Sequence, residues 1–187
     1  VKGRPYIRSE ESPANPVPGK KNPTILCQTN SILNVGAETW IYHGRWLNVE
    51  FQSLVEPNCL ARDYWAGVGL AKIPRDRWGA LALWHDEDRG SAWTGPIELR
   101  LDSALWANVA DSKGMRFELA DQMFQPLPGF ENGRAESDSA DNLDAQVHWD
   151  GRQLSELCGR TVRVRIHFQR SVETNPRLFA LTFKPAD

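Results

Sequence analysis

The sequence predicts an all-β protein, a β-sandwich or jelly roll preceded by a few antiparallel strands. From residue 25 onward, short apolar stretches are separated by turn residues, and few of them are long or periodic enough for a helix. Three later segments alternate apolar and charged side chains with a period of two, which is typical of strands with one buried face. Repeated strands of this kind indicate two sheets packed face to face.

The N-terminal part is expected to combine an arm with two pairs of strands. Five of the twelve prolines lie within residues 1–24, which predicts an extended arm. Gly36 and Ala37 predict a hairpin turn with glycine in the first position. Pro74 and Asp76 end a later strand. The strands expected in this part cover residues 32–35, 39–42, 66–72 and 78–85.

A polar break at residues 86–90 marks the expected boundary between units 25–89 and 90–187. In the second unit, Val162 and Val164 alternate with Arg163 and its neighbours, so one side of the strand is expected to be buried. The strands expected here cover residues 97–101, 105–110, 115–119, 145–149, 162–168 and 178–183. Residues 153–157 are expected to form one helical turn.

The composition excludes two classes of partner. The formal net charge is −2, and the basic residues are scattered along the chain. A sequence-independent nucleic-acid binder needs a basic face that displaces counterions from phosphates, so no nucleic acid is expected. A membrane-spanning helix needs about 20 consecutive apolar residues. The sequence has no such run, so no membrane is expected as a partner either.

Signals for metal or disulfide sites are weak. The chain has three cysteines, Cys27, Cys59 and Cys158. They are widely spaced and match neither a dense disulfide framework nor a zinc motif, but one disulfide between two of them remains an open alternative. Carboxylates in an irregular loop are ligands that calcium accepts, but a solvated loop is the favoured interpretation of the acidic segment. The weak metal candidates in this segment are Asp138, Asp141 and Asp144. We therefore expect no metal and no cofactor, with calcium left open.

Four segments together resemble the C-terminal end of bacterial glycoside-hydrolase-like proteins similar to glycoside hydrolase families 32 and 43. The segments are GAETWIYHGRW, GLAKIPRDRWGALALW, WDGRQLSELCGRTVRVRIHF and RLFALTF. In that group a five-bladed β-propeller is followed by a β-sandwich. The resemblance covers residues 25–183, and it implies that residues 25–89 form the end of the last blade and residues 90–187 the sandwich.

The resemblance also carries expectations about function. The catalytic carboxylates of these families come from earlier propeller blades, so none of them can be assigned to a residue of this chain. The implied partner is a polysaccharide or oligosaccharide, or a catalytic propeller domain. The sequence alone leaves the compartment open, and the resemblance implies an extracellular or periplasmic protein.

Tryptophans are the first candidates for ligand contact, because their large planes stack on sugar faces. The chain has eight of them. Trp106 alternates with the apolar residues on either side of it and is therefore expected to be exposed. Trp40 and Trp46 are the other candidates. Core packing is the usual role of aromatic residues on strands and remains the favoured alternative.

The charged side of the alternating strands is the second candidate. Its members could cover one sheet face and grip hydroxyl groups, although a ladder of cross-strand ion pairs is favoured. They are Glu98, Arg100, Arg116, Glu118, Arg163, Arg165 and His167. A jelly-roll glycosidase would place two carboxylates about 5–9 Å apart on such a face. Glu98 and Glu118 are the only obvious pair, and they are a weak one.

The favoured function is a noncatalytic carbohydrate-associated module that binds polysaccharide or stabilises a catalytic domain. One alternative is a small jelly-roll glycoside hydrolase that uses Glu98 and Glu118. A purely structural domain is the third interpretation. We lean against catalysis, because the sequence has neither a nucleophile elbow nor a metalloprotease motif.

Overall fold

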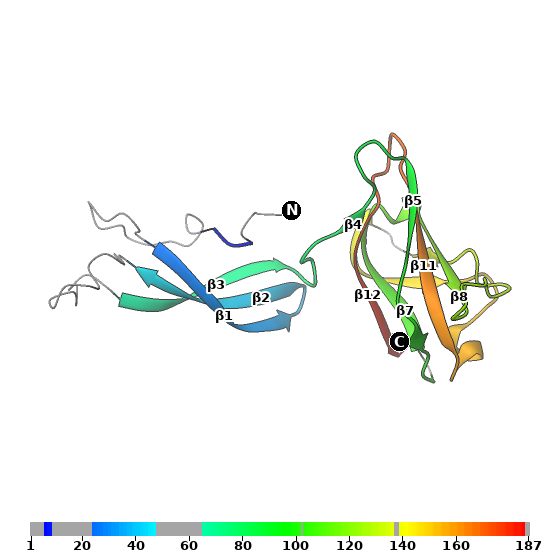
Figure 1. The fold of residues 1–187 in the computed structure, drawn as a ribbon, viewed down its shortest axis with the longest axis horizontal. Coiled ribbons are helices and arrows are strands. Elements are labelled where there is room, and N and C mark those ends of the chain that lie inside the picture. The colour runs from blue at the N-terminus through cyan, green and yellow to red at the C-terminus, as the bar shows by residue number, and fades with distance from the viewer. Residues whose placement is uncertain (1–5, 9–23, 48–64, 102, 137–138, 186–187) are drawn as a thin grey trace. The chain divides into compact units, whose positions relative to one another are not determined.

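The computed structural model describes residues 6–8, 24–47, 65–101, 103–136 and 139–185 (Figure 1). The regular elements of these residues are strands and two short 3-10 turns, which confirms the all-β prediction. The expected arm, apart from residues 6–8 and Thr24, lies outside the described residues, as does Cys59. Cys158 is an exposed free thiol. No helix in the described ranges has the length and apolar character needed to cross a bilayer.

Contacts divide the chain into two compact units, Val1–Arg75 and Asp76–Asp187. The division precedes the boundary expected near residue 89. The reason is strand β4 (Leu81–Ala82), which pairs with β12 (Arg177–Pro185) near the other end of the chain. Residues 76–89 are therefore part of the second unit.

The first unit contains one antiparallel sheet with the strand order β1-β2-β3. Its strands are β1 (Thr24–Val35), β2 (Glu38–Leu47) and β3 (Trp65–Pro74). The predicted Gly36-Ala37 turn joins β1 to β2, and Gly36 has a φ of 58°. Among its described residues, Ile41 is the one large hydrophobic side chain that is buried.

The second unit contains two antiparallel sheets (Figure 1). One has the order β4-β12-β7-β10-β9, where the strands not yet given are β7 (Ser103–Ala110), β10 (Asp141–His148) and β9 (Arg134–Ala135). In the other, β11 (Thr161–Gln169) pairs with β5 (Arg89–Trp93), β6 (Ile97–Glu98) and β8 (Met115–Ala120). The two sheets enclose the core, as a β-sandwich does.

The segment after β8 connects the two sheets along one side. Gly133 exchanges two backbone hydrogen bonds of 2.8 Å with Phe117, and the neighbouring β9 pairs with β10. The Trp149 indole Nε1 donates to the carbonyl oxygens of Phe130, at 2.9 Å, and Phe117, at 3.2 Å. This buried ring therefore ties β8 to the end of β10.

The core confirms the period-two prediction. Phe117 and Val164 are completely buried, and Ile166 is 2% exposed.

Two predicted strands are shorter than expected. Residues 78–85 form only β4, and the strand predicted at 97–101 ends at Glu98, because a turn begins at Arg100, whose carbonyl accepts from the Ser103 amide at 3.3 Å.

Candidate functional site

Trp106 is not the exposed platform that the sequence predicts, because it is only 9% exposed. Its strand, β7, has neighbours on both edges and is buried along nearly its whole length. Lys184 of β12 places its Nζ 4.0 Å from the centroid of the Trp106 ring, and the same Nζ lies 3.4 Å from Asp144. The lysine covers the aromatic face, as long cationic side chains do with their stems. The burial of the ring, and not the cation alone, removes the exposed aromatic plane that the sequence predicts.

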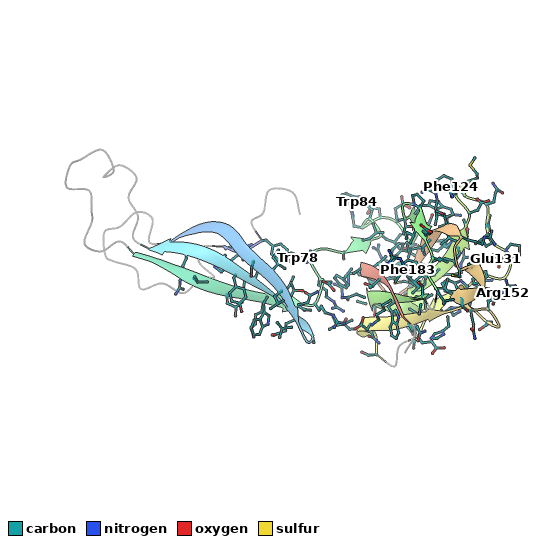
Figure 2. The ribbon with its side chains drawn as sticks, turned by 90° about the horizontal axis from the view of Figure 1, so that it is seen from below. Trp78, Trp84, Phe124, Glu131, Arg152 and Phe183 are labelled. Atoms are coloured by element: carbon teal, nitrogen blue, oxygen red, sulfur yellow. The ribbon has the colours of Figure 1, made fainter. Side chains whose placement is uncertain are left out.

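Trp40 is partly covered, and the side chain of Trp46 lies outside the described residues. The Trp40 Nε1 donates to Glu38 at 2.8 Å, and the Nζ of Lys72 lies 4.5 Å from the centroid of the ring. One face of Trp40 is thus occupied by an ammonium group. Other aromatic side chains are more exposed: Figure 2 shows Trp84 and Phe124 at the periphery of the second unit, and they are 72% and 48% exposed.

The acidic segment does not assemble a metal site among the described residues. Asp141 is bound by Arg77, whose Nη1 lies 3.0 Å from Oδ2, and this hydrogen bond lowers the pKa of Asp141. Asp144 faces Lys184, and Asp138 is not among the described residues. No group of three His, Cys, Asp or Glu side chains with metal-binding geometry occurs in the part of the chain that the structure describes.

Glu98 and Glu118 do not form a pair of neighbouring carboxylates. Glu98 of β6 lies opposite Thr161 of β11, whereas Glu118 of β8 lies opposite Arg165. These registers differ by four residues of β11, which correspond to about 13 Å along an extended strand. A two-carboxylate glycosidase needs a separation of about 5–9 Å. The structure therefore separates the two residues that the glycosidase alternative requires.

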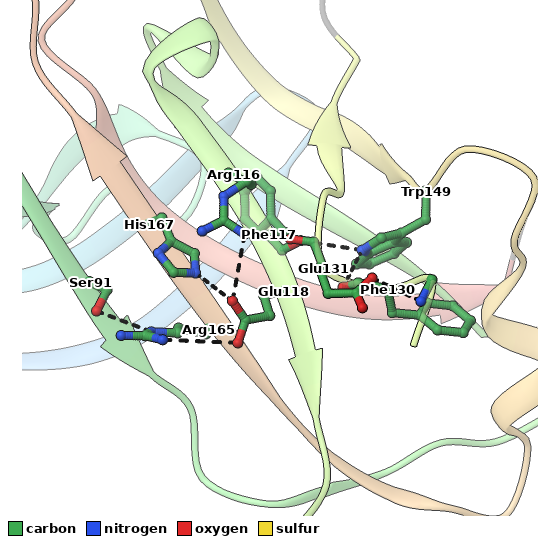
Figure 3. Close-up of polar contacts among 10 residues, drawn as sticks. Ser91, Arg116, Phe117, Glu118, Phe130, Glu131, Trp149, Arg165 and His167 are labelled. Atoms are coloured by element: carbon green, nitrogen blue, oxygen red, sulfur yellow. Dashed lines mark hydrogen bonds and ion pairs between the residues drawn. The ribbon is translucent and has the colours of Figure 1, made fainter. Parts of the chain in front are cut away.

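Glu118 instead lies at the centre of a cationic network (Figure 3). Its side chain is only 8% exposed, and its Oε2 lies 2.8 Å from the Nε2 of His167. Arg116 and Arg165 approach the same carboxylate at 3.5 and 4.0 Å. Burying a carboxylate is unfavourable unless charged partners and hydrogen bonds compensate. The three basic side chains supply this compensation.

His167 loses affinity for protons in this network. Burial lowers its pKa below the ordinary value of 6.5, and the charges of Arg116 and Arg165 lower it further, against an opposite effect of Glu118. At neutral pH the imidazole is therefore uncharged, and its Nε2 donates to Glu118. The positive charge of the network comes from the arginines.

The network belongs to a larger surface, which we name the arginine face. It is the outer side of β5, β11 and β8, and its members follow from the registers of these strands. Arg165, for example, lies between Trp93 of β5 and Glu118 of β8, and its Nε donates to the Ser91 hydroxyl at 3.2 Å. The face consists of Arg89, Ser91, Trp93, Arg116, Glu118, Arg163, Arg165 and His167, together with Phe124.

Two aromatic rings interleave with the arginines of this face. The Arg165 guanidinium lies 5.1 Å from the centroid of the Trp93 ring, and that of Arg163 lies 4.4 Å from the centroid of Phe124. Trp93 and Phe124 contact each other edge to face, with centroids 5.2 Å apart. Stacking of this kind fixes the planes of both guanidinium groups.

A strained turn brings Phe124 to the face. The Asp121 carboxylate accepts hydrogen bonds from the backbone amides of Met123 and Gln125, at 2.8 and 2.9 Å. Within this turn Phe124 has a φ of 64°, a left-handed conformation that is unfavourable for a bulky side chain. Neither Phe124 nor Trp93 is among the candidates that the sequence predicts. The alternation of Arg89, Ser91 and Trp93 was a signal for Trp93.

Comparisons with protein-family models, with curated proteins and with solved structures find no match for this chain.

Proposed function

We propose that this chain is a noncatalytic carbohydrate-associated module of a glycoside-hydrolase-like protein and that its arginine face binds a polysaccharide. One observation carries the proposal: fixed guanidinium donors alternate with aromatic rings on a single sheet face. The connection to glycoside hydrolases rests on the resemblance of the four sequence segments.

The chemistry of this surface suits sugars. Sugar rings offer hydroxyl and ring oxygens around their edges and C–H groups on their faces, and aromatic rings pack against the C–H groups. Arg163 uses its Nε and Nη1 to bind the carbonyl oxygens of Gln122 and Thr94 at 3.2 and 3.1 Å. Within the described part of the chain, its Nη2 has no partner. The guanidinium is thus positioned in advance and keeps donors for a ligand, which lowers the entropic cost of binding.

The same surface lacks what glycoside hydrolysis needs. Hydrolysis by the usual route requires an acid and a second carboxylate on opposite sides of the scissile bond. Glu118 is held by three basic side chains, and Glu98 lies about four residues away along β11. These positions favour binding without cleavage.

A retention assay on a panel of insoluble polysaccharides tests this proposal. We expect the full chain to be retained by at least one of them. Trp93→Ala removes the aromatic group beside Arg165 and should weaken retention by about tenfold, since one aromatic contact contributes about 1 kcal/mol or slightly more.

Trp78→Ala is the matched control. Trp78 is 42% exposed and precedes β4 in the other sheet, so its loss should leave retention unchanged. The thermal unfolding midpoint of each variant reports whether the fold is intact. Absence of retention across the panel, or equal losses in the two variants, would contradict the proposal.

A further inference from the structure

We infer that the polysaccharide bound by the arginine face is anionic and carries carboxylate or sulfate groups. This inference rests on the proposed function and adds the chemical class of the ligand. The face holds four arginines, Arg89, Arg116, Arg163 and Arg165, but a single glutamate, Glu118. The whole chain, in contrast, has a net charge of −2. The face therefore carries a local excess of positive charge.

Glu118 offsets only part of the positive charge of the four arginines, and its carboxylate lies below the surface that they form. The Glu118 side chain is 8% exposed, whereas the side chains of Arg116 and Arg165 are 35% and 36% exposed. Solvent and ligand thus meet guanidinium groups and not the carboxylate between them. His167, whose pKa is lowered, adds no compensating or additional charge at neutral pH.

The carboxylates beside the face lie at its margin or are engaged, as that of Asp121 is by two backbone amides of the turn that carries Phe124. Glu98 lies beside Thr161, toward the opposite end of β11 from His167. The Glu131 carboxylate accepts a hydrogen bond from the Gly129 amide at 2.8 Å, while the Glu131 carbonyl oxygen accepts from Arg116. These positions leave the centre of the face positive.

Guanidinium groups recognise carboxylate and sulfate more strongly than neutral hydroxyls. The guanidinium keeps its positive charge at every relevant pH, and its hydrogen bonds to charged acceptors are about twice as strong as those to neutral ones. Arg163 and Arg165 lie two residues apart on β11, about 6.6 Å along the strand. They can meet two charged groups of one chain, while Trp93 and Phe124 offer apolar contact between them.

Affinity electrophoresis of the full chain tests the inference with three soluble polymers. The probes are polygalacturonate, the same polymer after reduction of its carboxyl groups, and dextran sulfate. We expect binding to at least one of the charged polymers to be tenfold or more tighter than to the reduced polymer, and to weaken as salt is added. The charged polymer that binds more tightly identifies carboxylate or sulfate as the preferred group.

Arg163→Gln and Arg165→Gln should each weaken binding to the charged polymer by about tenfold, which corresponds to one lost charged hydrogen-bonding group. Arg163 binds carbonyl oxygens and no buried carboxylate, so its variant is expected to fold even if Arg165→Gln does not. Arg134→Gln is the matched control, because Arg134 is an exposed arginine of β9 in the other sheet. It should bind like the unaltered chain.

The outcomes separate this inference from the proposed function. Equal binding to the charged and the reduced polymer overturns the inference and leaves the proposed function intact. Binding to none of these polymers, combined with no retention on insoluble polysaccharides, overturns both. Single-stranded DNA serves as a comparison in the same assay, and tighter binding to it than to either charged polymer also overturns the inference, because the face would then be a nucleic-acid site.

Discussion

The surroundings of Glu118 can be predicted only in part from the sequence. The alternation along β8 and β11 places Glu118, Arg116, Arg165 and His167 on one side of a sheet, as the sequence predicts. Their pairing into a buried network depends on the register of β8 against β11. That register joins segments far apart in the chain, and local periodicity cannot fix it.

Phe124 could not be predicted from residue properties. It occupies a turn that Asp121 holds in a left-handed conformation, and strand patterns do not extend into such turns. The sequence therefore indicates the charged part of the candidate site, while the aromatic part depends on loop geometry.

His167 should make the stability of the second unit depend on pH. Its pKa is lowered in the folded state, so the unfolded chain binds the proton more readily. The contribution of His167 to the free energy of unfolding is fully present above the ordinary pKa of 6.5. It is lost as the pH falls from 6.5 through the lower pKa of His167 in the folded state. Urea unfolding between about pH 8 and pH 5 measures this loss. The variant His167→Gln should lose less stability over this pH range than the unaltered chain.

His85→Gln is the control for this prediction. The His85 side chain is 72% exposed, so its replacement should keep the pH dependence of the unaltered chain. An unchanged slope in His167→Gln, or an equal reduction in both variants, would show that His167 is not the responsible group.

At the scale of elements, the predictions succeed where one face of a strand is covered and fail where both are. β11 alternates as expected, with Val162 and Val164 inside and Arg163 outside. β7 is almost continuously apolar, and it is a central strand whose outer side is covered by Lys184 over Trp106 and by Arg77, which binds Asn108. Trp106 is therefore buried on the side that its pattern marks as exposed.

Gly133 should be essential for the connection between β8 and β9. A Cβ atom at this position would lie 2.5 Å from Cε2 of Trp149, a ring already held by two carbonyl oxygens. Gly133→Ala should lower the free energy of unfolding by about 1–3 kcal/mol, because neither the ring nor the paired backbone can give way easily. Gly95→Ala, where a Cβ would meet nothing within 4 Å, should change it little in the same urea titration. Equal effects would contradict this packing.

At the scale of the whole molecule, the two units differ in the core that their described residues form. The second unit has a continuous cluster that includes Phe117, Phe130 and Trp149. In the sheet of the first unit, Leu33, Val68 and Leu70 are 54%, 64% and 43% exposed. The all-β class was predictable from the sequence, whereas this difference in burial depends on which strands pair.

A chain of residues 76–187 should therefore fold by itself. We expect a cooperative unfolding transition and the near-ultraviolet circular dichroism of packed tryptophans, with a midpoint close to that of the second unit in the full chain. A spectrum without fixed aromatic signals would show that this unit depends on residues 1–75.

An NMR titration of the isotope-labelled full chain with oligogalacturonate or another bound oligosaccharide locates the binding surface residue by residue. We expect the shifted amide and side-chain signals to cluster on β5, β8 and β11, including the indole of Trp93 and the guanidinium groups of Arg163 and Arg165. Shifts confined to β7, β10 and β12, or to the first unit, would contradict this expectation.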